Sequence, residues 1–383
     1  MERFALSRMK EWKENENRKP LIIRGARQVG KTWIMKTFGQ QYFEKTAYVN
    51  FDNNARMKQV FEGDLDIERL VLAISAETGV SIEAENTLII FDEIQEVPKA
   101  LTSLKYFHEN APQYAIVAAG SLLGVALHQG TSFPVGKVDF LDLYPLNFRE
   151  FLCAMGEKQF VSMLDSCDTQ MVTVFKTKYI ERLREYYFVG GMPEVVKDFS
   201  EKKDYNRVRA IQKNLINYYQ QDFSKHAEIK LVPRLNLVWN SIPMQLAKEN
   251  KKYIYGQVRE GSRAKDFELA IQWLLDCGLI HKVQRIQKPD LPLKAYIDFD
   301  AFKLFLVDIG LLIAMTDLDA KVIIEGNKIF TEFKGSLTEQ YILQQLISDV
   351  GVIPYYYSTQ NSKGEIDFLV QGKTSVIPIE VKA

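Results

Sequence analysis

The chain of 383 residues contains only three cysteines and four histidines, and this scarcity narrows the chemistry that it can perform. Cys153, Cys167 and Cys277 are widely separated and form no C-x-x-C pair, so they indicate neither a zinc site nor a disulfide framework. Reduced thiols are typical of a cytoplasmic protein, and we expect that location. The histidines are equally scattered, so we interpret them as structural or surface residues.

Long apolar runs and an excess of one charge are also missing. No stretch of about twenty apolar residues occurs, so we expect no membrane-spanning helix and no membrane partner. The longest candidate, Tyr114 to Leu127, is short and contains Gly120, Ser121 and Gly124. Residues 1–4 lack the apolar core of a signal peptide. Lysines plus arginines number 49, and so do aspartates plus glutamates, so any nucleic-acid surface must be local.

The chain does contain enough apolar side chains, 46% of its residues, to build substantial cores. Its length favours two to four domains rather than one. We therefore look for function in local motifs, because the bulk composition does not single out a partner.

The most informative stretch lies between the apolar run Leu21–Ile23 and a helix predicted over Trp33–Phe38. It matches G-x-x-x-x-G-K-T in the strand–loop–helix setting of a phosphate-binding loop. Glycines let the backbone close around phosphate oxygens, and the loop N–H groups and the helix N-terminus attract anions. The alternative is a glycine-containing turn that matches by accident. The predicted nucleotide-binding residues are Gly25, Ala26, Arg27, Gln28, Val29, Gly30, Lys31 and Thr32.

Four side chains have specific predicted roles with ATP and Mg²⁺. Lys31 is expected to reach the β- and γ-phosphates, and the Thr32 hydroxyl to hold Mg²⁺. The apolar run over residues 88–91 suits a buried parallel strand that ends in two acidic residues. Asp92 is predicted to bind Mg²⁺ directly or through water. Glu93 is predicted to polarise the attacking water, which favours hydrolysis over phosphoryl transfer to a small molecule.

Two further polar residues follow predicted strands. Ser121 comes after the apolar strand Tyr114–Ala119, where ATPases with an extra strand between their two motif strands place a residue that touches the γ-phosphate or the attacking water. A turn serine is the alternative. Asn50 ends the strand predicted over Thr46–Phe51 and is a weaker candidate to orient Glu93.

Several motifs together resemble a bacterial and archaeal family of AAA-type ATPases, most of whose members are uncharacterised. The resemblance covers nearly the whole chain. Its members carry a C-terminal domain that resembles restriction endonucleases of the PD-(D/E)xK type. The matching stretches are residues 25–32, Phe91-Asp92-Glu93-Ile94-Gln95, Ala119-Gly120-Ser121, Pro145-Leu146-Asn147-Phe148-Arg149-Glu150-Phe151 and Tyr187-Phe188-Val189-Gly190-Gly191-Met192-Pro193-Glu194.

One departure from the family concerns the arginine that completes such sites. The family usually has Gly-Arg before the last core strand, predicted here over Val138–Leu143, but this chain has Gly136-Lys137. Lysine cannot make the same bidentate contact. Arg149 or Arg184 could substitute, and we select Arg149 as the catalytic candidate. Because AAA-type sites often use a neighbouring subunit's arginine, the resemblance also implies a homo-oligomer.

The middle of the chain is predicted to contain a lid and a DNA-binding type of module. Residues 156–225 are mostly helical in pattern, with a candidate hinge at Gly190-Gly191. Residues 226–318 include helices followed by paired strands that resemble a winged helix. From 246 to 288 there are nine Lys/Arg and five Asp/Glu, a net charge of +4. DNA contact is one interpretation of this mildly basic region, and a spacer is the other.

The last region, residues 319–383, contains a candidate nuclease site. Asp367, Glu380 and Lys382 have the D-x12-E-x-K arrangement of restriction-type nucleases. Alternation places Glu380 and Lys382 on one face of a strand. Asp367 and Glu380 can bind Mg²⁺ while Lys382 activates a water, and Glu339 is a further candidate ligand. The alternative is a nuclease-like fold whose carboxylates only pair with Lys382. The chain stops at Ala383, directly after the motif, so we expect an incomplete domain: either the native protein continues or the chain has been trimmed.

The sequence thus predicts an α/β protein with a P-loop ATPase core over residues 1–155, followed by the helical lid, the winged-helix module and the restriction-endonuclease-like domain. The first functional hypothesis is Mg²⁺-dependent ATP hydrolysis coupled to nucleic-acid handling, with candidate metal-dependent cleavage of DNA. The second is an ATP-driven switch or scaffold whose inert terminal domain binds a partner. Intact Asp367, Glu380 and Lys382 favour the first hypothesis, whereas the neutral charge and Lys137 favour the second.

Overall fold

Residues 3–144 form one unit of the fold, and residues 145–383 together with residues 1–2 form the other. The structure is a computed structural model that describes residues 2–121, 124, 133–248, 251–324, 331–359 and 364–382, with only the backbone of 331–333. No helix in these described ranges is long and apolar enough to cross a membrane.

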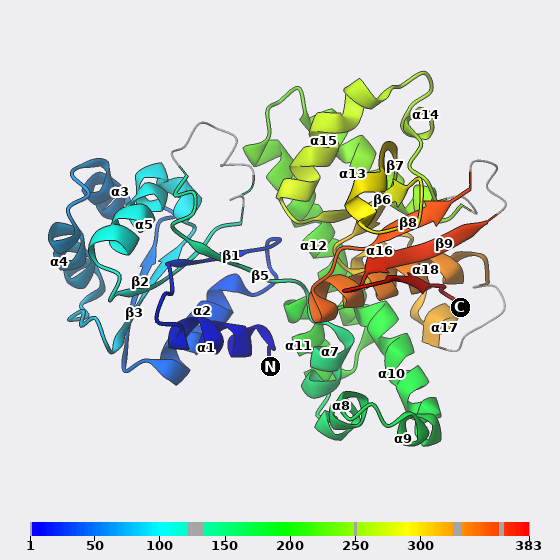
Figure 1. The fold of residues 1–383 in the computed structure, drawn as a ribbon, viewed down its shortest axis with the longest axis horizontal. Helices are drawn as coiled ribbons and strands as arrows, with labels where there is room; N and C mark the ends of the chain where they lie inside the picture. Colours follow the sequence, from blue (N-terminus) through cyan, green and yellow to red (C-terminus); the bar gives the residue numbers. More distant parts are fainter. Residues whose placement is uncertain are drawn as a thin grey trace. The chain divides into compact units, whose positions relative to one another are not determined.

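The unit of residues 3–144 is built around a five-stranded parallel sheet (Figure 1). Its strands are β1 (Leu21–Arg24), β2 (Lys45–Asn50), β3 (Thr87–Asp92), β4 (Ala115–Ala119) and β5 (Asp139–Asp142). Its helices are α1 (Ala5–Glu14), α2 (Lys31–Tyr42), α3 (Ala55–Glu62), α4 (Ile67–Thr78) and α5 (Pro98–Asn110). Every strand that the sequence predicts in this unit is present, with its ends displaced by at most one residue.

The strand order is β2-β3-β4-β1-β5, so β4 lies between the two strands that carry the nucleotide motifs. Leu21 of β1 pairs with Val117 of β4, and Ile90 of β3 pairs with the same Val117 from the other side. All pairings are parallel, so the carboxyl ends of β1, β3 and β4 share one edge of the sheet. This edge collects the predicted ATP-site residues.

Both faces of the sheet are covered, which explains why its strands are continuous apolar runs rather than alternating ones. Ile89 and Phe91 of β3 belong to a core that is shared with α3, α4 and α5. Helix α2 packs on β2, β3 and β4, and α1 packs beside α2 (Figure 1). All six residues of β3 are buried, including Asp92 at its end.

The other unit begins with helices and ends with a second sheet. Its first helices are α7 (Phe148–Ala154), α8 (Lys158–Asp165), α9 (Thr169–Val174), α10 (Lys176–Val189), α11 (Pro193–Lys202) and α12 (Tyr205–His226). They are followed by α13 (Val232–Leu246), α14 (Tyr255–Val258), α15 (Ala264–Asp276), α16 (Ile309–Met315), α17 (Ala320–Ile324) and α18 (Thr331–Gln345). The helices of the predicted lid end with α12 at His226, and α13, α14 and α15 lie in the next region, where helices are also predicted.

The second sheet joins strands from two regions that the sequence assigns to different modules. Its strands are β6 (Ile280–Ile286), β7 (Ile297–Leu306), β8 (Tyr355–Ser358), β9 (Glu365–Gln371) and β10 (Val376–Ile379). The order is β10-β9-β8-β6-β7, and Arg285 of β6 pairs with Tyr356 of β8. The expected boundary between residues 318 and 319 thus falls between strands that share hydrogen bonds.

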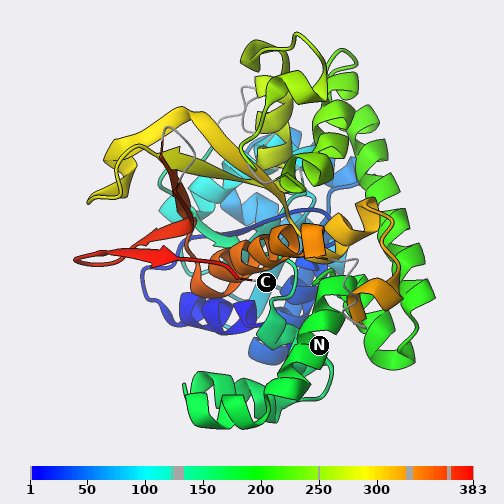
Figure 2. The ribbon, with the colours of Figure 1, turned by 90° about the vertical axis from the view of Figure 1, so that its right-hand side faces the viewer.

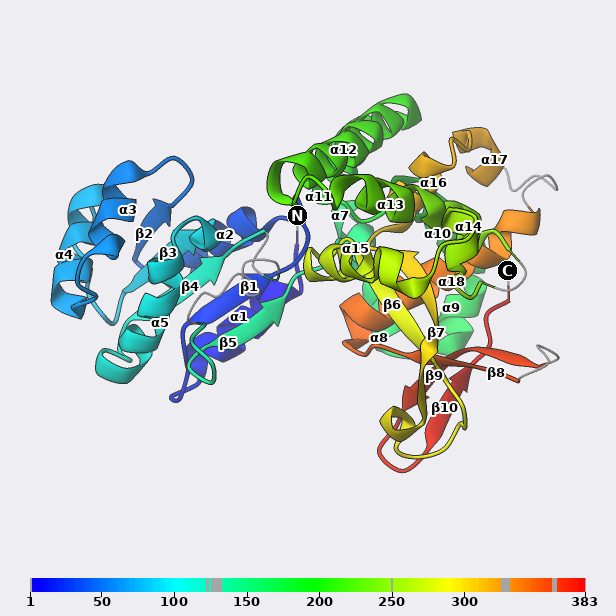
Figure 3. The ribbon, with the colours of Figure 1, turned by 90° about the horizontal axis from the view of Figure 1, so that it is seen from above.

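Two sets of helices pack against this sheet. Figure 3 shows α13 and α15 next to β6 and β7, and α13 packs against β7 while α15 packs against β6. Figure 2 shows the orange helix α18 beside the yellow and red strands. Gln340 of α18 fixes this packing, because its side chain exchanges two hydrogen bonds with the backbone of Leu306 at the end of β7.

The predicted hinge at Gly190-Gly191 is a tightly packed junction between α10 and α11. The Gly191 N–H donates to Oδ2 of the buried Asp308 at 2.6 Å, and its carbonyl accepts from the Leu146 N–H at 2.7 Å. A Cβ at Gly191 would lie 2.0 Å from the Leu146 oxygen, so only glycine fits there. The glycines therefore allow close backbone approach in this structure.

Candidate active site

The phosphate-binding loop connects the end of β1 to the start of α2. Gly25 has φ +143°, and a Cβ there would lie 2.1 Å from the Leu143 oxygen, so this turn requires glycine. Gly30, with φ 95°, is the N-cap of α2, and Lys31 and Thr32 form the first turn of that helix. The loop N–H groups and the positive end of the helix dipole thus form the type of anion site that the motif predicts.

Lys31 is folded back onto its own loop. Its Nζ donates to the carbonyl oxygens of Gly25 at 2.8 Å and Ala26 at 2.7 Å, and the side chain is buried. The ammonium group therefore already lies inside the curve of the loop. A bound phosphate would compete with these two neutral carbonyls, and a charged acceptor makes the stronger hydrogen bond.

Asp92 joins the two motifs. The Thr32 hydroxyl donates to Asp92 Oδ2 at 2.7 Å, and the Tyr48 hydroxyl donates to the same oxygen at 2.9 Å. The second carboxylate oxygen, Oδ1, accepts from the Glu93 N–H at 3.1 Å. A hydroxyl and a carboxylate in direct contact are a suitable oxygen donor set for Mg²⁺, which usually binds one or two protein oxygens together with phosphates and water.

Glu93 lies at the centre of a hydrogen-bonded chain at the same sheet edge. Its Oε2 accepts from the Gln95 side chain at 2.7 Å and from the Ser121 hydroxyl at 3.0 Å. Ser121 in turn accepts from Arg27 Nε at 3.0 Å. Glu93 itself has φ 51°, a conformation that is uncommon for residues with a Cβ and is frequent at functional sites.

These neighbours control the charge of Glu93. Burial acts to raise the pKa of Glu93, but hydrogen bonds from Gln95 and Ser121 and the charges of Lys31 and Arg27 outweigh it. The pKa of Glu93 is therefore below its ordinary value. An ionised carboxylate at neutral pH can accept a proton from a water molecule. Gln95 Oε1 is buried and has no hydrogen-bond partner in the described part of the chain, so it remains available to a water or ligand.

Asn50 does not contact Glu93 through a described hydrogen bond. Its Oδ1 accepts from the Asp52 N–H at 2.8 Å, which closes a turn after β2. Gln95, within the matched stretch of residues 91–95, occupies the orienting position instead.

The arginine candidates have other partners. Lys137, which replaces the family's arginine, forms an ion pair with Glu109 at 3.0 Å. Arg149 lies in the other unit, where it pairs with Asp349 at 3.0 Å and also with Asp165. Arg184 donates to the Ile324 carbonyl oxygen at 3.3 Å. Arg27 of the phosphate-binding loop is the arginine that is linked to Glu93, through the hydrogen bonds of Ser121.

The predicted nuclease residues lie on α18 and the last two strands. Asp367 is on β9, and its Oδ2 accepts from the Val381 N–H at 2.8 Å. Glu380 and Lys382 follow the end of β10 and are exposed. Within the described ranges, no group of three or more His, Cys, Asp and Glu side chains is arranged to hold a metal ion.

Glu339 forms ion pairs with two lysines, neither of which was predicted from the sequence as a site residue. Lys303, whose side chain is 1% exposed, pairs with Glu339 at 3.4 Å and with Glu365 at 2.5 Å, and Lys251 also pairs with Glu339. Burial acts to lower the pKa of Lys303, but Glu339, Glu365 and Asp367 outweigh it, so this pKa is raised and the ammonium stays charged. The donor set is thus already compensated by protein cations and does not fit a metal ion well.

Other residues that support the sites were also missed. Arg3 is buried and donates to the carbonyl oxygens of Val29 at 3.0 Å and Tyr144 at 2.6 Å, so it fastens the phosphate-binding loop to the segment after β5. Tyr48 gave no signal, because an aromatic residue in a strand is usually a core residue. Lys303 gave a signal that could have been used, since a lysine within the apolar stretch Lys303–Leu311 needs a buried partner.

Comparison with known families identifies the first unit. The description "AAA domain" matches residues 17–152. Residues 180–322 match a domain of unknown function (DUF8612), and residues 334–383 match another domain of unknown function (DUF4143). Residues 17–152 are therefore an ATP-binding P-loop domain of the AAA type, whereas the other two matches name no activity. No curated protein matches the chain.

Comparison with solved structures gives the same fold. A Walker-type ATPase of Pyrococcus abyssi has a TM-score of 0.50 and 15% identity, over 82% of this chain and 95% of that chain. The ORC1 protein of Aeropyrum pernix in complex with DNA has a TM-score of 0.28 and 13% identity, over 82% and 91%. The RuvB Holliday junction branch migration motor of Thermotoga maritima has a TM-score of 0.31 and 12% identity, over 72% and 87%. Only the first score reaches 0.5, and at this identity it concerns the fold alone.

Proposed function

We propose that this chain, whose residues 17–152 form an AAA-type P-loop domain, hydrolyses ATP with the help of Mg²⁺. The observation that carries the proposal is the bonded chain at Glu93, whose Oε2 accepts hydrogen bonds from both Gln95 and Ser121. A protein that only bound ATP would need the loop and the Mg²⁺ ligands, but it would not need an oriented, ionised carboxylate beside them.

The roles of the residues follow from their positions. The N–H groups of residues 25–32 surround the phosphates, and Lys31 exchanges its two carbonyl partners for the β- and γ-phosphates. Thr32 and Asp92 hold Mg²⁺, which when bound neutralises charge on the phosphate oxygens. Glu93 takes a proton from the attacking water, and Ser121 and Gln95 keep its carboxylate in place.

We further propose that full activity needs an arginine from a second copy of the chain. Lys137 and Arg149 both have carboxylate partners of their own, which supports this assignment. Arg27 supplies a positive charge from within the loop, but its Nε is engaged by Ser121. A homo-oligomer would bring an additional guanidinium to the γ-phosphate, as AAA-type sites often require.

Coupling to nucleic acid is the proposed use of the ATP. The order of α13, α14, α15 and the antiparallel pair β6–β7 supports the winged-helix interpretation. Within residues 246–288, helix α15 contains one lysine and three acidic residues, a net charge of −2. The segments of this region outside α15 have eight Lys/Arg and two Asp/Glu, a net charge of +6. This distribution favours contact with the phosphate backbone over base readout by that helix.

The test is a steady-state ATPase assay of the full chain with Mg²⁺, without DNA and with single- or double-stranded DNA. We expect Mg²⁺-dependent phosphate release that increases with one form of DNA. Release without any effect of DNA would keep the ATPase proposal and remove the coupling. No release with or without DNA, under conditions in which ATP binds, would remove the ATPase proposal.

A second candidate function is favoured by the lysines at Glu339: an ATP-driven switch whose terminal domain is inert as a nuclease and binds a partner. The sequence places Asp367, Glu380 and Lys382 as a metal site, but Glu339 is neutralised by Lys251 and Lys303. A metal ion could bind Glu339 only if its ion pairs with Lys251 and Lys303 were broken. Breaking a buried ion pair is costly, because it leaves a buried charge without a partner.

This second candidate is tested with supercoiled plasmid and Mn²⁺, comparing the full chain with Asp367→Ala and Glu380→Ala. We expect no cleavage by any form of the protein. We also expect no Mn²⁺ binding in an isothermal titration of the Lys31→Ala variant without ATP, a form chosen so that no metal binds together with nucleotide phosphates. Cleavage by the wild type that disappears in both variants would establish the nuclease and overturn the inert-domain proposal.

A further inference from the structure

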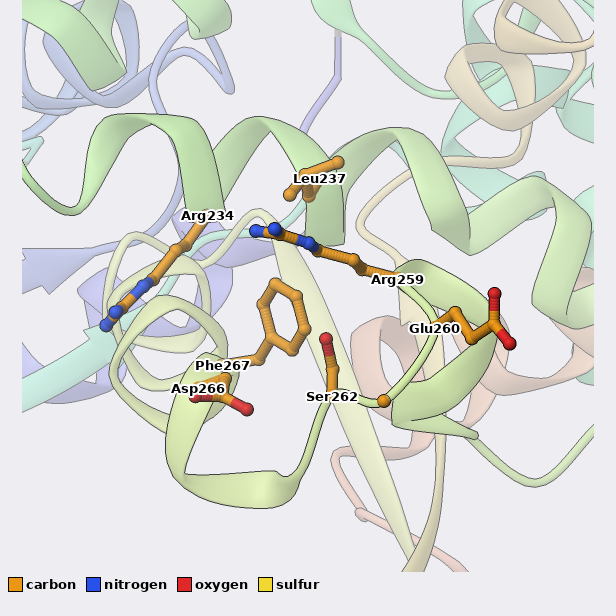
Figure 4. A pocket seen from close by; sticks show the side chains of 8 residues that line it. Arg234, Leu237, Arg259, Glu260, Ser262, Asp266 and Phe267 are labelled. Atoms are coloured by element: carbon orange, nitrogen blue, oxygen red, sulfur yellow. The ribbon is translucent and has the colours of Figure 1, made fainter.

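A pocket that is unrelated to the phosphate-binding loop lies between α13 and the start of α15. Its volume is about 320 Å³, and all its lining residues belong to the unit of residues 145–383. This volume is at the small end of ligand sites, which span about 300–1,000 Å³. The residues around it are Arg234, Leu237, Arg259, Glu260, Gly261, Ser262, Asp266 and Phe267 (Figure 4).

The two arginines differ from most others in this unit because no described carboxylate pairs with them. Arg234 is on the first turn of α13, and Arg259 follows α14. Each guanidinium keeps five N–H donors and a permanent charge. The arginines of this unit that form ion pairs with carboxylates are Arg149, Arg182, Arg207 and Arg285.

The two acidic residues of the pocket do not neutralise these arginines in the structure. The Asp266 carboxylate accepts from the Arg263 N–H at 2.8 Å and thereby caps α15. Glu260 extends away from Phe267 in Figure 4, on the far side of the loop. The pocket therefore presents two guanidiniums with no described ion pair, although its formal charge is balanced.

Two apolar side chains, Leu237 and Phe267, complete the mainly polar lining. Phe267 is buried and forms the floor, Leu237 is 40% exposed on the opposite side, and the Arg259 side chain passes between them in Figure 4. The Ser262 hydroxyl is directed toward the same space and adds a hydrogen-bonding group. A ligand that matches this lining has an anionic group for the guanidiniums and an apolar surface for Leu237.

We propose that the pocket binds one phosphorylated nucleotide unit, with its phosphate at Arg234 and Arg259 and its base against the exposed side chain of Leu237. This inference rests on the proposed nucleic-acid role, because that role implies that the bound nucleotide unit belongs to single-stranded DNA. Positive side chains that follow the phosphates and side chains that contact the faces of the bases hold a single strand without reading its sequence. A free mononucleotide has the same chemistry, and the experiment separates the two sources.

The experiment uses the full chain free of ADP and ATP, because either nucleotide carries the phosphorylated unit that the pocket is proposed to bind. Binding of fluorescein-labelled oligothymidylate is measured by fluorescence anisotropy at low salt, with thymidine 5′-monophosphate as the competitor. We expect the double variant Arg234→Gln/Arg259→Gln to bind the oligonucleotide at least about tenfold more weakly. Its basal ATPase activity should be unchanged. The matched control, Lys176→Gln/Lys178→Gln, removes the same charge from the exposed start of α10 in the same unit and should bind as the wild type does.

A further variant tests the base contact independently of charge. Leu237→Ala should weaken oligonucleotide binding by a few-fold without changing its salt dependence, because it removes apolar contact and no phosphate contact. Competition by the mononucleotide at concentrations similar to the oligonucleotide would support the pocket and identify the free nucleotide as the source. Competition only at much higher concentrations would support the DNA strand.

Three results would overturn the inference. The first is equal weakening in the arginine and lysine double variants, which would indicate general electrostatic attraction. The second is unchanged binding in the arginine variant. The third is a wild-type protein that binds neither probe while it still hydrolyses ATP, a result that removes the pocket proposal and leaves the ATPase proposal intact.

Discussion

Ser121 donates a hydrogen bond of 3.0 Å to Glu93, although 28 positions separate the two residues in the chain. They meet because β3 and β4 are adjacent parallel strands whose carboxyl ends share one edge of the sheet. The insertion of β4 between β1 and β3 thus brings a third polar position to the ATP site, between the phosphate-binding loop and the acidic pair.

Replacement of Lys31 should remove nucleotide binding. We expect Lys31→Ala to weaken ATP affinity by at least about tenfold, or about 1.4 kcal/mol, because it removes the ammonium group that is expected to contact the β- and γ-phosphates. Isothermal titration with ATP and Mg²⁺ measures this. Lys31 is buried and bonds two loop carbonyls, so circular dichroism should confirm folding. Lys58→Ala, at an exposed position of α3, is the control, and unchanged affinity in Lys31→Ala would refute the site.

Replacement of Glu93 should separate binding from turnover. Glu93→Gln keeps the size of the side chain but cannot accept a proton, so ATP should bind normally and be hydrolysed roughly 10²-fold more slowly. The comparison is made by titration and by single-turnover phosphate release. Wild-type turnover in this variant would assign the role of base to another group.

Gln95 should set the pH at which the site loses activity. Glu93 acts only when ionised, so hydrolysis should be present above its pKa and should fall as the pH decreases through that value. Gln95→Ala removes a donor that lowers the pKa of Glu93, so the acidic limb of the pH–rate profile should move to higher pH. Gln41→Ala, an exposed change on α2, should leave the profile in place. An unmoved profile in Gln95→Ala would show that this hydrogen bond does not control Glu93.

Asp308 should make stability depend on pH. Burial raises the pKa of Asp308 to about 6 despite hydrogen bonds from the Gly191 and Leu311 N–H groups. A carboxyl whose folded pKa is raised stabilises the fold at pH below its unfolded value near 3.8, and this contribution is lost as the pH rises to about 6. The loss amounts to roughly 3 kcal/mol, since one pKa unit corresponds to about 1.4 kcal/mol.

The measurement compares urea denaturation of the wild type and Asp308→Asn at pH 4.5 and 7.5, followed by tryptophan fluorescence. The asparagine does not titrate, so the stability advantage of the wild type should be larger at pH 4.5. Asp300→Asn, at an exposed position of β7, should keep the pH dependence of the wild type. Parallel pH dependences of the wild type and Asp308→Asn would contradict the assignment.

The sequence by itself determined the ATP-binding half of the protein. Gly25 to Thr32 are contiguous, and Asp92 and Glu93 directly follow an apolar strand, so the chemistry can be recognised without knowledge of distant contacts. The strands of that sheet were predictable within one residue because a parallel sheet covered on both faces requires short, continuously apolar runs. The geometry of such a loop is local, since one strand, one turn and one helix create it.

Only the tertiary structure decided which side chains serve these motifs. Tyr48 reaches Asp92 through strand order, which is a property of the whole sheet, and the same order gives Ser121, already a candidate from the sequence, its contact with Glu93. The pairing of β6 with β8 joins two regions that looked separate in the sequence. Lys303 and Glu339 form a buried ion pair across 36 positions, and this changes the interpretation of the terminal carboxylates. Local patterns cannot reveal such pairs, because the cost of burying a charge is balanced by whichever partner the fold brings near.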